Sequence, residues 1–174
     1  MISYILAVVT GIAVIFADQY TKIIAAANLK LGETTRFIDG FIDFTYVHNT
    51  GGAWGMLSGY TWLLVSIIII VMLICIALLM RYGFKNKLMF WAITLVLAGG
   101  LGNMFDRIFR DGEVIDFLHF SFWKSFPVFN VADISIVVGA GLLMLYFIIG
   151  IIKDNKQRKK NDLLKKVNSD GLDN

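Results

Sequence analysis

Four long apolar segments, separated by more polar connections, dominate the hydrophobic pattern of the chain. They lie near residues 4–26, 61–80, 88–107 and 133–152. A helix needs about 20 residues to cross a hydrocarbon core of about 30 Å, and each segment is long enough. The second and fourth are the most uniformly apolar, whereas the first and third end in polar residues. The pattern therefore predicts a membrane all-α protein with four transmembrane helices.

Shorter alternating patterns occupy the two longer connections between these segments. Residues 35–48 and 113–122 alternate apolar with polar positions and are rich in aromatic and β-branched residues. Such alternation is typical of short strands with one covered face. We therefore expect a strand in each connection, and together a small β-containing subdomain that rests on the membrane surface.

The basic residues set the expected orientation of the four helices. Lysine and arginine gather at 81–87, between the second and third apolar segments, and in the tail 153–174. Because short basic connections stay in the cytoplasm, both regions should be cytoplasmic, and so should the N-terminus. The strand-forming connections then face outward. We expect a four-span domain over 1–152, followed by a basic cytoplasmic tail.

The composition agrees with a membrane protein and argues against other classes. Apolar residues make up 57% of the chain, more than a water-facing surface allows. The net charge is +3, but no basic groove with interleaved aromatic residues is visible, so nucleic acid is not an expected partner. Cys75 is the only cysteine and lies in an apolar run, where a thiol keeps its proton. We expect it to be a packing residue.

Ionisable residues within a membrane span are costly and need a reason. Asp18 and Lys22 lie four residues apart near the end of the first span, in the order that favours an ion pair on one helical face. One interpretation is a structural bridge, with Lys22 extending to the membrane interface. The other is support of a functional site, and the two are compatible.

Two glycine-rich segments suggest close approach of the backbone to a partner. Residues 49–55 contain three glycines, a pattern that by itself most often marks a turn. Residues 99–107 place glycines before Asn103, Asp106 and Arg107, so that small residues could let helices pack closely. Asn103 and Arg107 are four residues apart and share a helical face. We expect a hydrogen-bonding platform at the outer end of the third span.

Two aspartates near the outer boundary are candidates for acid–base chemistry. Asp116 lies within a predicted strand, where a solvent-facing position is the usual interpretation. Asp133 lies where the fourth span begins, so it or Asn130 could cap that helix. Two carboxylates brought close together share a proton, and one can then activate water while the other protonates a carbonyl oxygen.

Other functions have less support in the sequence. His48 and His119 show no metal-ligand spacing, and no serine has a Gly-x-Ser-x-Gly context. A small transporter or channel would need polar residues through the depth of the membrane, yet the polar residues gather at one face. A non-catalytic scaffold would need no cluster of carboxylates.

Several of these motifs together resemble bacterial lipoprotein signal peptidase, also called signal peptidase II, over essentially all residues up to 152. The motifs that carry the resemblance are Asp18-Gln19-x-x-Lys22, Asn49-x-Gly51-x-Ala53, Gly99-Gly100-x-Gly102-Asn103-x-x-Asp106-Arg107, Val114-Ile115-Asp116-Phe117 and Phe129-Asn130-x-Ala132-Asp133. Each motif is weak alone, but their order among four spans is specific.

The resemblance implies a role for each matching residue. Asp116 and Asp133 would be the catalytic dyad of an aspartic endopeptidase. Supporting or substrate-binding roles are implied for Asp18, Lys22, Asn49, Gly51, Asn103, Asp106, Arg107, Asn130 and Ala132.

The resemblance also implies a substrate and a location. The substrate would be a prolipoprotein whose lipobox cysteine carries a diacylglyceryl group, cleaved just before that cysteine. Together with the orientation set by the basic residues, we expect a monomer in the bacterial cytoplasmic membrane, in contact with membrane lipids, with its active site at the outer face. The resemblance implies no metal or organic cofactor, and it implies sensitivity to globomycin-type inhibitors.

Overall fold

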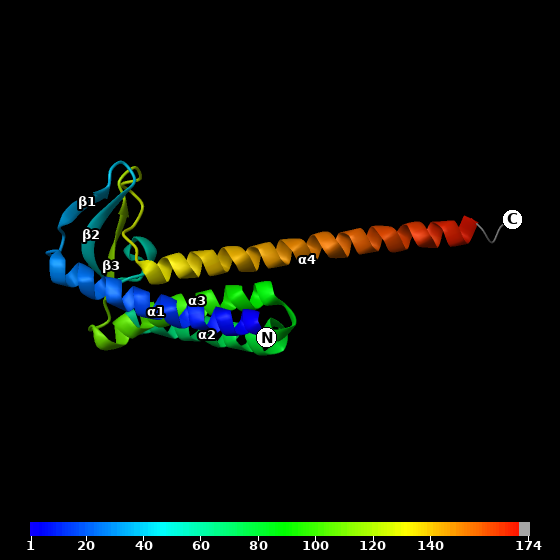
Figure 1. Cartoon of the computed structure of the whole chain (residues 1–174), viewed down its shortest axis with the longest axis horizontal. Coiled ribbons are helices and arrows are strands. Elements are labelled where there is room, and N and C mark those ends of the chain that lie inside the picture. The colour runs from blue at the N-terminus through cyan, green and yellow to red at the C-terminus, as the bar shows by residue number, and fades with distance from the viewer. Residues whose placement is uncertain (171–174) are drawn as a thin grey trace.

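The computed structural model describes the backbone of residues 1–170 and the side chains of residues 1–161. Four long helices run side by side, and three strands gather at one end of them (Figure 1). The helices are α1 (Ile2–Asn28), α2 (Thr61–Tyr82), α3 (Lys87–Phe109) and α4 (Val131–Asp170), and the strands are β1 (Thr34–Ile38), β2 (Ile42–Asn49) and β3 (Val114–Phe120). Short 3-10 turns, η1 (Ala53–Gly55) and η2 (Gly83–Lys85), flank α2.

The four predicted spans are confirmed as helices long and apolar enough to cross a membrane. The fourth helix, however, does not end with its apolar segment at residue 152. It continues into the basic tail, because neither proline nor glycine interrupts residues 151–161. The side chains of residues 162–170 and all of residues 171–174 lie outside the described part of the chain, so the tail prediction is described only in part.

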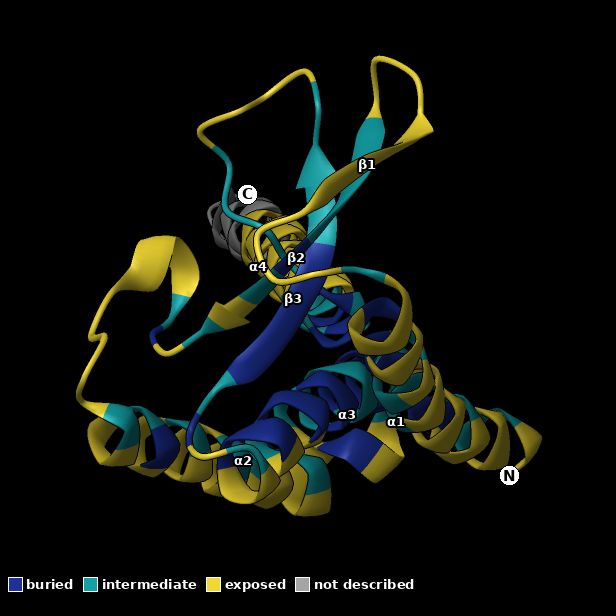
Figure 2. Cartoon of the chain, turned by 90° about the vertical axis from the view of Figure 1, so that its left-hand side faces the viewer, coloured by how far each residue is buried: buried dark blue, intermediate teal, exposed yellow. Residues whose placement is uncertain are grey.

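Helix α3 is the most buried of the four and packs against the other three. Figure 2 shows this burial along α3 and β3, while the outer faces of α1 and α2 are exposed. The exposed side chains of the spans are largely apolar, as for Ile12 on α1, Leu73 on α2 and Val137 on α4. In a bilayer such faces contact lipid. Cys75 is buried among apolar residues between α2 and α3, as its sequence context predicted.

Small residues let α1 and α4 approach α3 closely, as the glycine pattern predicted. A Cβ atom at Gly99 would overlap the backbone carbonyl of Ala132 at the start of α4. A Cβ atom at Gly102 would lie 2.7 Å from the Asp18 carboxylate of α1. A larger residue at either position would therefore push apart the helix ends that meet there.

The strands form one antiparallel sheet in the order β1-β2-β3. Residues 35–48 are not one strand, as predicted, but two: the chain reverses at Gly40, whose φ of +69° suits a glycine in a tight turn. The strand predicted at 113–122 is confirmed as β3. On one face, Tyr46, Ile115 and Phe117 pack with Ala25 of α1. Because side chains alternate along a strand, Asp116 points to the opposite face.

Candidate active site

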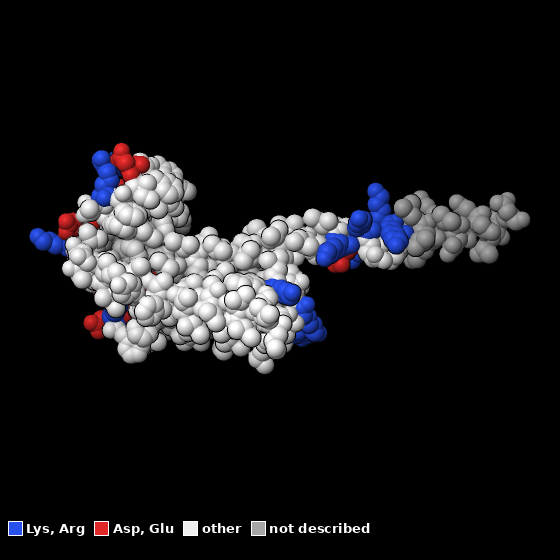
Figure 3. Space-filling model, viewed as in Figure 1, with Lys and Arg blue, Asp and Glu red and all other residues white. Residues whose placement is uncertain are grey.

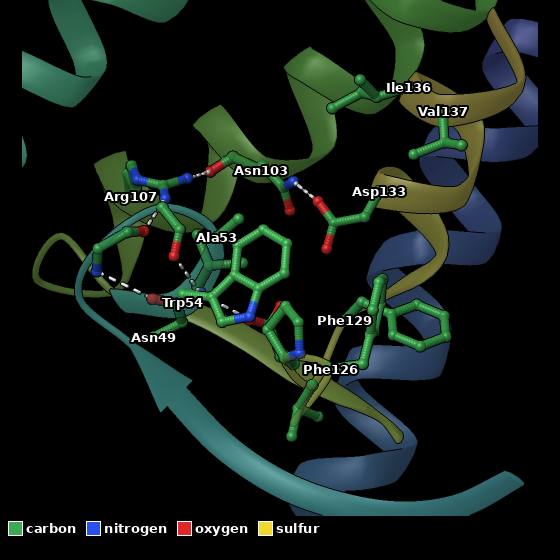
Figure 4. Close-up of a pocket in the computed structure, with 16 residues that line it drawn as sticks. Asn49, Ala53, Trp54, Asn103, Arg107, Phe126, Phe129, Asp133, Ile136 and Val137 are labelled. Atoms are coloured by element: carbon green, nitrogen blue, oxygen red, sulfur yellow. Dashed lines mark hydrogen bonds between the residues drawn. The ribbon is translucent and has the colours of Figure 1, made fainter. Parts of the chain in front are cut away.

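A cleft of about 340 Å³ lies where the sheet meets the ends of α3 and α4 (Figure 4). Its polar lining comes from β2, α3, β3 and α4, and its apolar lining comes from η1, the segment before α4 and the first turns of α4. The polar side chains are Asn49, Asn103, Arg107, Asp116 and Asp133, and the apolar ones include Trp54, Phe126, Phe129, Ile136 and Val137. The cleft therefore has acid, amide and guanidinium groups on one side and hydrocarbon on the other.

Asp133 belongs both to a helix cap and to the cleft. Asn130 Oδ1 accepts the backbone N–H of Asp133 at 2.9 Å, and Asp133 Oδ2 accepts the backbone N–H of Asn130 at 3.1 Å. This reciprocal pair is a capping box that begins α4. The other carboxylate oxygen, Oδ1, accepts Asn103 Nδ2 at 2.7 Å. The cap expected from the sequence thus also fixes the Asp133 carboxylate within the cleft.

Asp116 is buried, with 2% of its surface exposed, so the solvent-facing strand position was wrong. Its Oδ1 accepts Asn130 Nδ2 at 2.6 Å, and its Oδ2 accepts Asn49 Nδ2 at 2.9 Å. Burial raises the pKa of Asp116 to about 7, and the negative charge of Asp133 adds to the rise. The hydrogen bonds from the Asn49 and Asn130 side chains and the positive charge of Lys22 oppose this rise in pKa.

Lys22 is fully buried, so it does not extend to the membrane interface. Its Nζ lies 2.8 Å from Asp18 Oδ2, 2.9 Å from Asp106 Oδ2 and 3.1 Å from Asn103 Oδ1. Asp18 Oδ1 accepts the backbone N–H of Ala132 at 2.9 Å, which ties α1 to the start of α4. The ion pair predicted between Asp18 and Lys22 is present, but it forms part of a larger buried network.

Arg107 connects α3 to the loop that follows β2. Its Nη2 donates to the Gly51 carbonyl at 2.7 Å, and its Nη1 donates to the Asn103 carbonyl one turn earlier at 3.3 Å. Asn49 Oδ1 accepts the Gly51 N–H at 2.9 Å. A Cβ atom at Gly51 would lie 2.7 Å from the backbone of Gly55 and Met56, so the loop folds tightly on a glycine here.

The structure brings all of the predicted site residues into this one network. It also adds two residues, Gln19 and Arg110, to which the sequence analysis assigned no role. Gln19 Nε2 donates to Asp18, to Asp106 and to the Gly102 carbonyl, and Arg110 Nε lies 3.3 Å from Asp106. Gln19 lies between Asp18 and Lys22 in a quoted motif, but nothing in that motif indicated its partners on α3.

Among the described residues, no group of three or more His, Cys, Asp or Glu side chains could hold a metal ion. His48 hydrogen-bonds to Glu113 and Tyr46, and the His48–Glu113 pair of potential ligands lacks a third in the described part of the chain. The expectation that the reaction needs no metal or organic cofactor stays a prediction.

Comparison with known proteins identifies relatives of this chain. The family model described as signal peptidase (SPase) II matches residues 10–149. Lipoprotein signal peptidase of Bacillus pumilus is 39% identical over 92% of this chain and 99% of its own length. The corresponding protein of Clostridium acetobutylicum is 40% identical over 90% of this chain and 98% of its own length.

A solved structure of a bacterial membrane enzyme has a similar fold. Its TM-score is 0.77 at 35% identity, and the match covers 86% of this chain and 89% of that protein. A second such structure has a TM-score of 0.75 at 34% identity, over 82% of this chain and 92% of that protein. Fold, motifs and sequence identity over most of the length agree: this chain belongs to the signal peptidase II family.

Proposed function

We propose that this protein is a membrane aspartic endopeptidase that cleaves lipoprotein signal peptides, with Asp116 and Asp133 as its catalytic dyad. The substrate is a prolipoprotein with a diacylglyceryl-modified cysteine, and the bond before that cysteine is broken. The observation that carries the proposal is the cleft itself, in which the buried Asp116 and the half-buried Asp133 accept hydrogen bonds from asparagine amides and face hydrocarbon across the cleft. Family membership supports lipoprotein signal peptides as the substrate class.

The chemistry requires the dyad to hold one proton between its two carboxyl groups. The ionised carboxylate takes a proton from water as the water oxygen attacks the scissile carbonyl carbon. The protonated carboxyl donates its proton to the carbonyl oxygen, which gives a neutral tetrahedral diol. Collapse of the diol breaks the C–N bond, protonates the leaving nitrogen and restores the single proton on the dyad.

The surroundings of the dyad suit a lipid-modified substrate. Ile136 and Val137 on α4 line the cleft, and Val137 is 70% exposed on a face that would contact lipid in a bilayer. A cysteine whose acyl chains lie in the membrane would thus present its peptide bond at the level of Asp133. A transporter is disfavoured, because the buried charges gather at one end of the bundle and do not line a path through it.

The preference for a lipidated substrate is the direct test of this proposal. The purified chain is expected to cleave a precursor with diacylglyceryl-cysteine just before that cysteine. The same precursor with unmodified cysteine is expected to lose at least about 100-fold in kcat/KM, because each buried CH₂ contributes about 0.8 kcal/mol. Mass spectrometry of the products checks both. Equal cleavage of the two precursors, or cleavage elsewhere, would contradict the proposal.

We further propose that the sheet and the cleft face outward from the bacterial cytoplasmic membrane. On the face shown in Figure 3, lysine and arginine mark the α2–α3 connection and the continuation of α4, at the end opposite the sheet. These residues include Arg81, Lys85, Lys153 and Lys156. The positive-inside rule then puts both termini in the cytoplasm.

A reporter fused after Asn174 is accordingly expected to be cytoplasmic, and one inserted at Gly40 in the exposed β1–β2 turn to be external. Proteolysis of intact cells and of inverted vesicles distinguishes the two sides. An external C-terminal reporter would overturn the orientation, while leaving the catalytic proposal in place. Binding of globomycin-type inhibitors belongs to the same proposal by family resemblance alone, and the protein is proposed to be a monomer.

A further inference from the structure

The side-chain amides of Asn49, Asn103 and Asn130 all direct their NH₂ groups toward the dyad. Each Nδ2 donates to a catalytic carboxylate: Asn49 and Asn130 to Asp116, and Asn103 to Asp133. An asparagine can present either its oxygen or its NH₂, so something must hold each amide in this orientation.

In each case a hydrogen-bond donor to the amide oxygen fixes the orientation of the side chain. The Gly51 N–H donates to Asn49 Oδ1 at 2.9 Å, and the Asp133 N–H donates to Asn130 Oδ1 at 2.9 Å. Asn103 Oδ1 accepts Lys22 Nζ at 3.1 Å and Asn130 Nδ2 at 3.0 Å. The ammonium can only donate, so a flipped Asn103 would bring its NH₂ against it. Lys22 therefore keeps the Asn103 NH₂ directed at Asp133.

The two carboxylates of the dyad nevertheless differ in their surroundings. Asp133 lies in the first turn of α4 and accepts a backbone N–H there, where the helix dipole favours a negative charge. Asp116 lies on a strand and is buried, and its carboxylate accepts only side-chain amide donors, from Asn49 and Asn130, among the described hydrogen bonds. Removal from water disfavours its charged form, and its pKa of about 7 agrees with this.

The buried charges around the dyad disfavour two negative charges on it. The groups that face the dyad or its partners come from α1 and α3 and from the turn that ends α3: the cations Lys22, Arg107 and Arg110 and the anions Asp18 and Asp106. Arg110 is 30% exposed, whereas the other four are buried, so the buried cations and anions are equal in number. No surplus of buried cations compensates two ionised carboxylates, so a dyad that holds one proton is less costly than a fully ionised one.

We infer that the two aspartates have fixed and different roles: Asp133 is the ionised base that activates water, and Asp116 is the protonated acid that protonates the scissile carbonyl. Asn103, oriented by Lys22, is the positioning residue that keeps Asp133 ionised. This inference rests on the proposed function and assigns the roles within the same dyad.

The pH dependence of kcat/KM separates the two roles. Only the singly protonated dyad is active, so the profile is bell-shaped: the acid limb reports ionisation of the base and the basic limb reports loss of the proton from the acid. An amide that donates to a carboxylate favours its charged form, so removing that amide moves the matching limb to higher pH. A lost charge-assisted hydrogen bond corresponds to about one pH unit.

Asn103→Ala is therefore expected to move the acid limb up by about one pH unit and to leave the basic limb in place. Asn49→Ala is expected to move the basic limb up by a similar amount and to leave the acid limb in place. Asn103→Ser is the second variant, because a helical serine bonds to the carbonyl one turn earlier and is too short to reach Asp133. Asn28→Ala, at an exposed position that ends α1, is the control and should move neither limb.

The opposite pattern, with Asn103 variants moving the basic limb, would show that the roles are reversed. Movement of both limbs in the Asn103 and Asn49 variants would show that the proton is not confined to one of the two aspartates. Either result overturns the inference and leaves the peptidase itself intact. The proposed function fails on a different observation, which is absence of cleavage by the unaltered chain.

Discussion

Asparagine in place of Asp116 or Asp133 is expected to lower kcat for cleavage of a lipidated precursor by at least about 10³-fold. Asparagine has nearly the shape of aspartate but can neither take a proton from water nor give one to a carbonyl. Because the two carboxylates act on one transition state, the double variant is expected to be little worse than either single variant. Single-turnover rates of the purified variants measure the effect.

Asp39→Asn is the matched control, because Asp39 is a highly exposed acid on the same side of the molecule. It is expected to keep the unaltered rate, and thermal unfolding of all the variants checks that they are folded. Full cleavage by either dyad variant would exclude the corresponding aspartate from catalysis. Suppose instead that each single variant lowered kcat only a few-fold and that the reduction in the double variant equalled the two single reductions multiplied together. The carboxylates would then act independently and not as a pair.

The helices of this fold could be predicted from the sequence because the bilayer imposes a length and a composition on each span. The ends of the helices were harder to predict, since an apolar span and the helix that contains it need not end at the same residue. Helix α4 shows this, because its apolar segment ends near residue 152 while the hydrogen-bonded helix continues. The β1–β2 hairpin was missed for a related reason. Alternation continues through its turn, and only Gly40 marks the reversal.

Within the candidate site, relations inside one element were predictable and relations between elements were not. The Asp18–Lys22 pair and the shared face of Asn103 and Arg107 follow from helical periodicity. The contact of Lys22 with Asp106 joins α1 to α3, and no spacing along the chain encodes it. Lys22 was therefore assigned to the membrane interface as one possibility, although its ammonium is fully buried.

Asn130 shows why a structural and a functional interpretation need not compete. Its Oδ1 and backbone N–H form the cap of α4 with Asp133, while its Nδ2 bonds Asp116. The cap fixes the amide orientation, and the fixed amide then bonds the carboxylate of β3. The same hydrogen bonds that begin the helix thus place the two aspartates at one cleft.

Methionine in place of Lys22 is expected to lower the free energy of unfolding by about 3 kcal/mol, the lower end of the range for breaking a buried ion pair. Methionine fills a similar volume but leaves the Asp18 and Asp106 carboxylates without their ammonium. The loss is moderated because each keeps other donors: Asp18 keeps the Ala132 N–H, and both keep Gln19. Denaturation in detergent micelles measures it, and Lys153→Met, at an exposed position, should change stability by no more than about 0.5 kcal/mol.

A double-mutant cycle with Asp18→Asn identifies the charge as the cause. Asp18→Asn alone removes one partner of Lys22, but in the Lys22→Met background it removes a carboxylate that has lost its counter-charge. The two changes should therefore be non-additive by about 1–3 kcal/mol, with the double variant more stable than the sum predicts. Strict additivity would mean that the buried network contributes no coupling. In either background, loss of the Lys22 donor also frees the Asn103 amide, so cleavage should fall even where the protein remains folded.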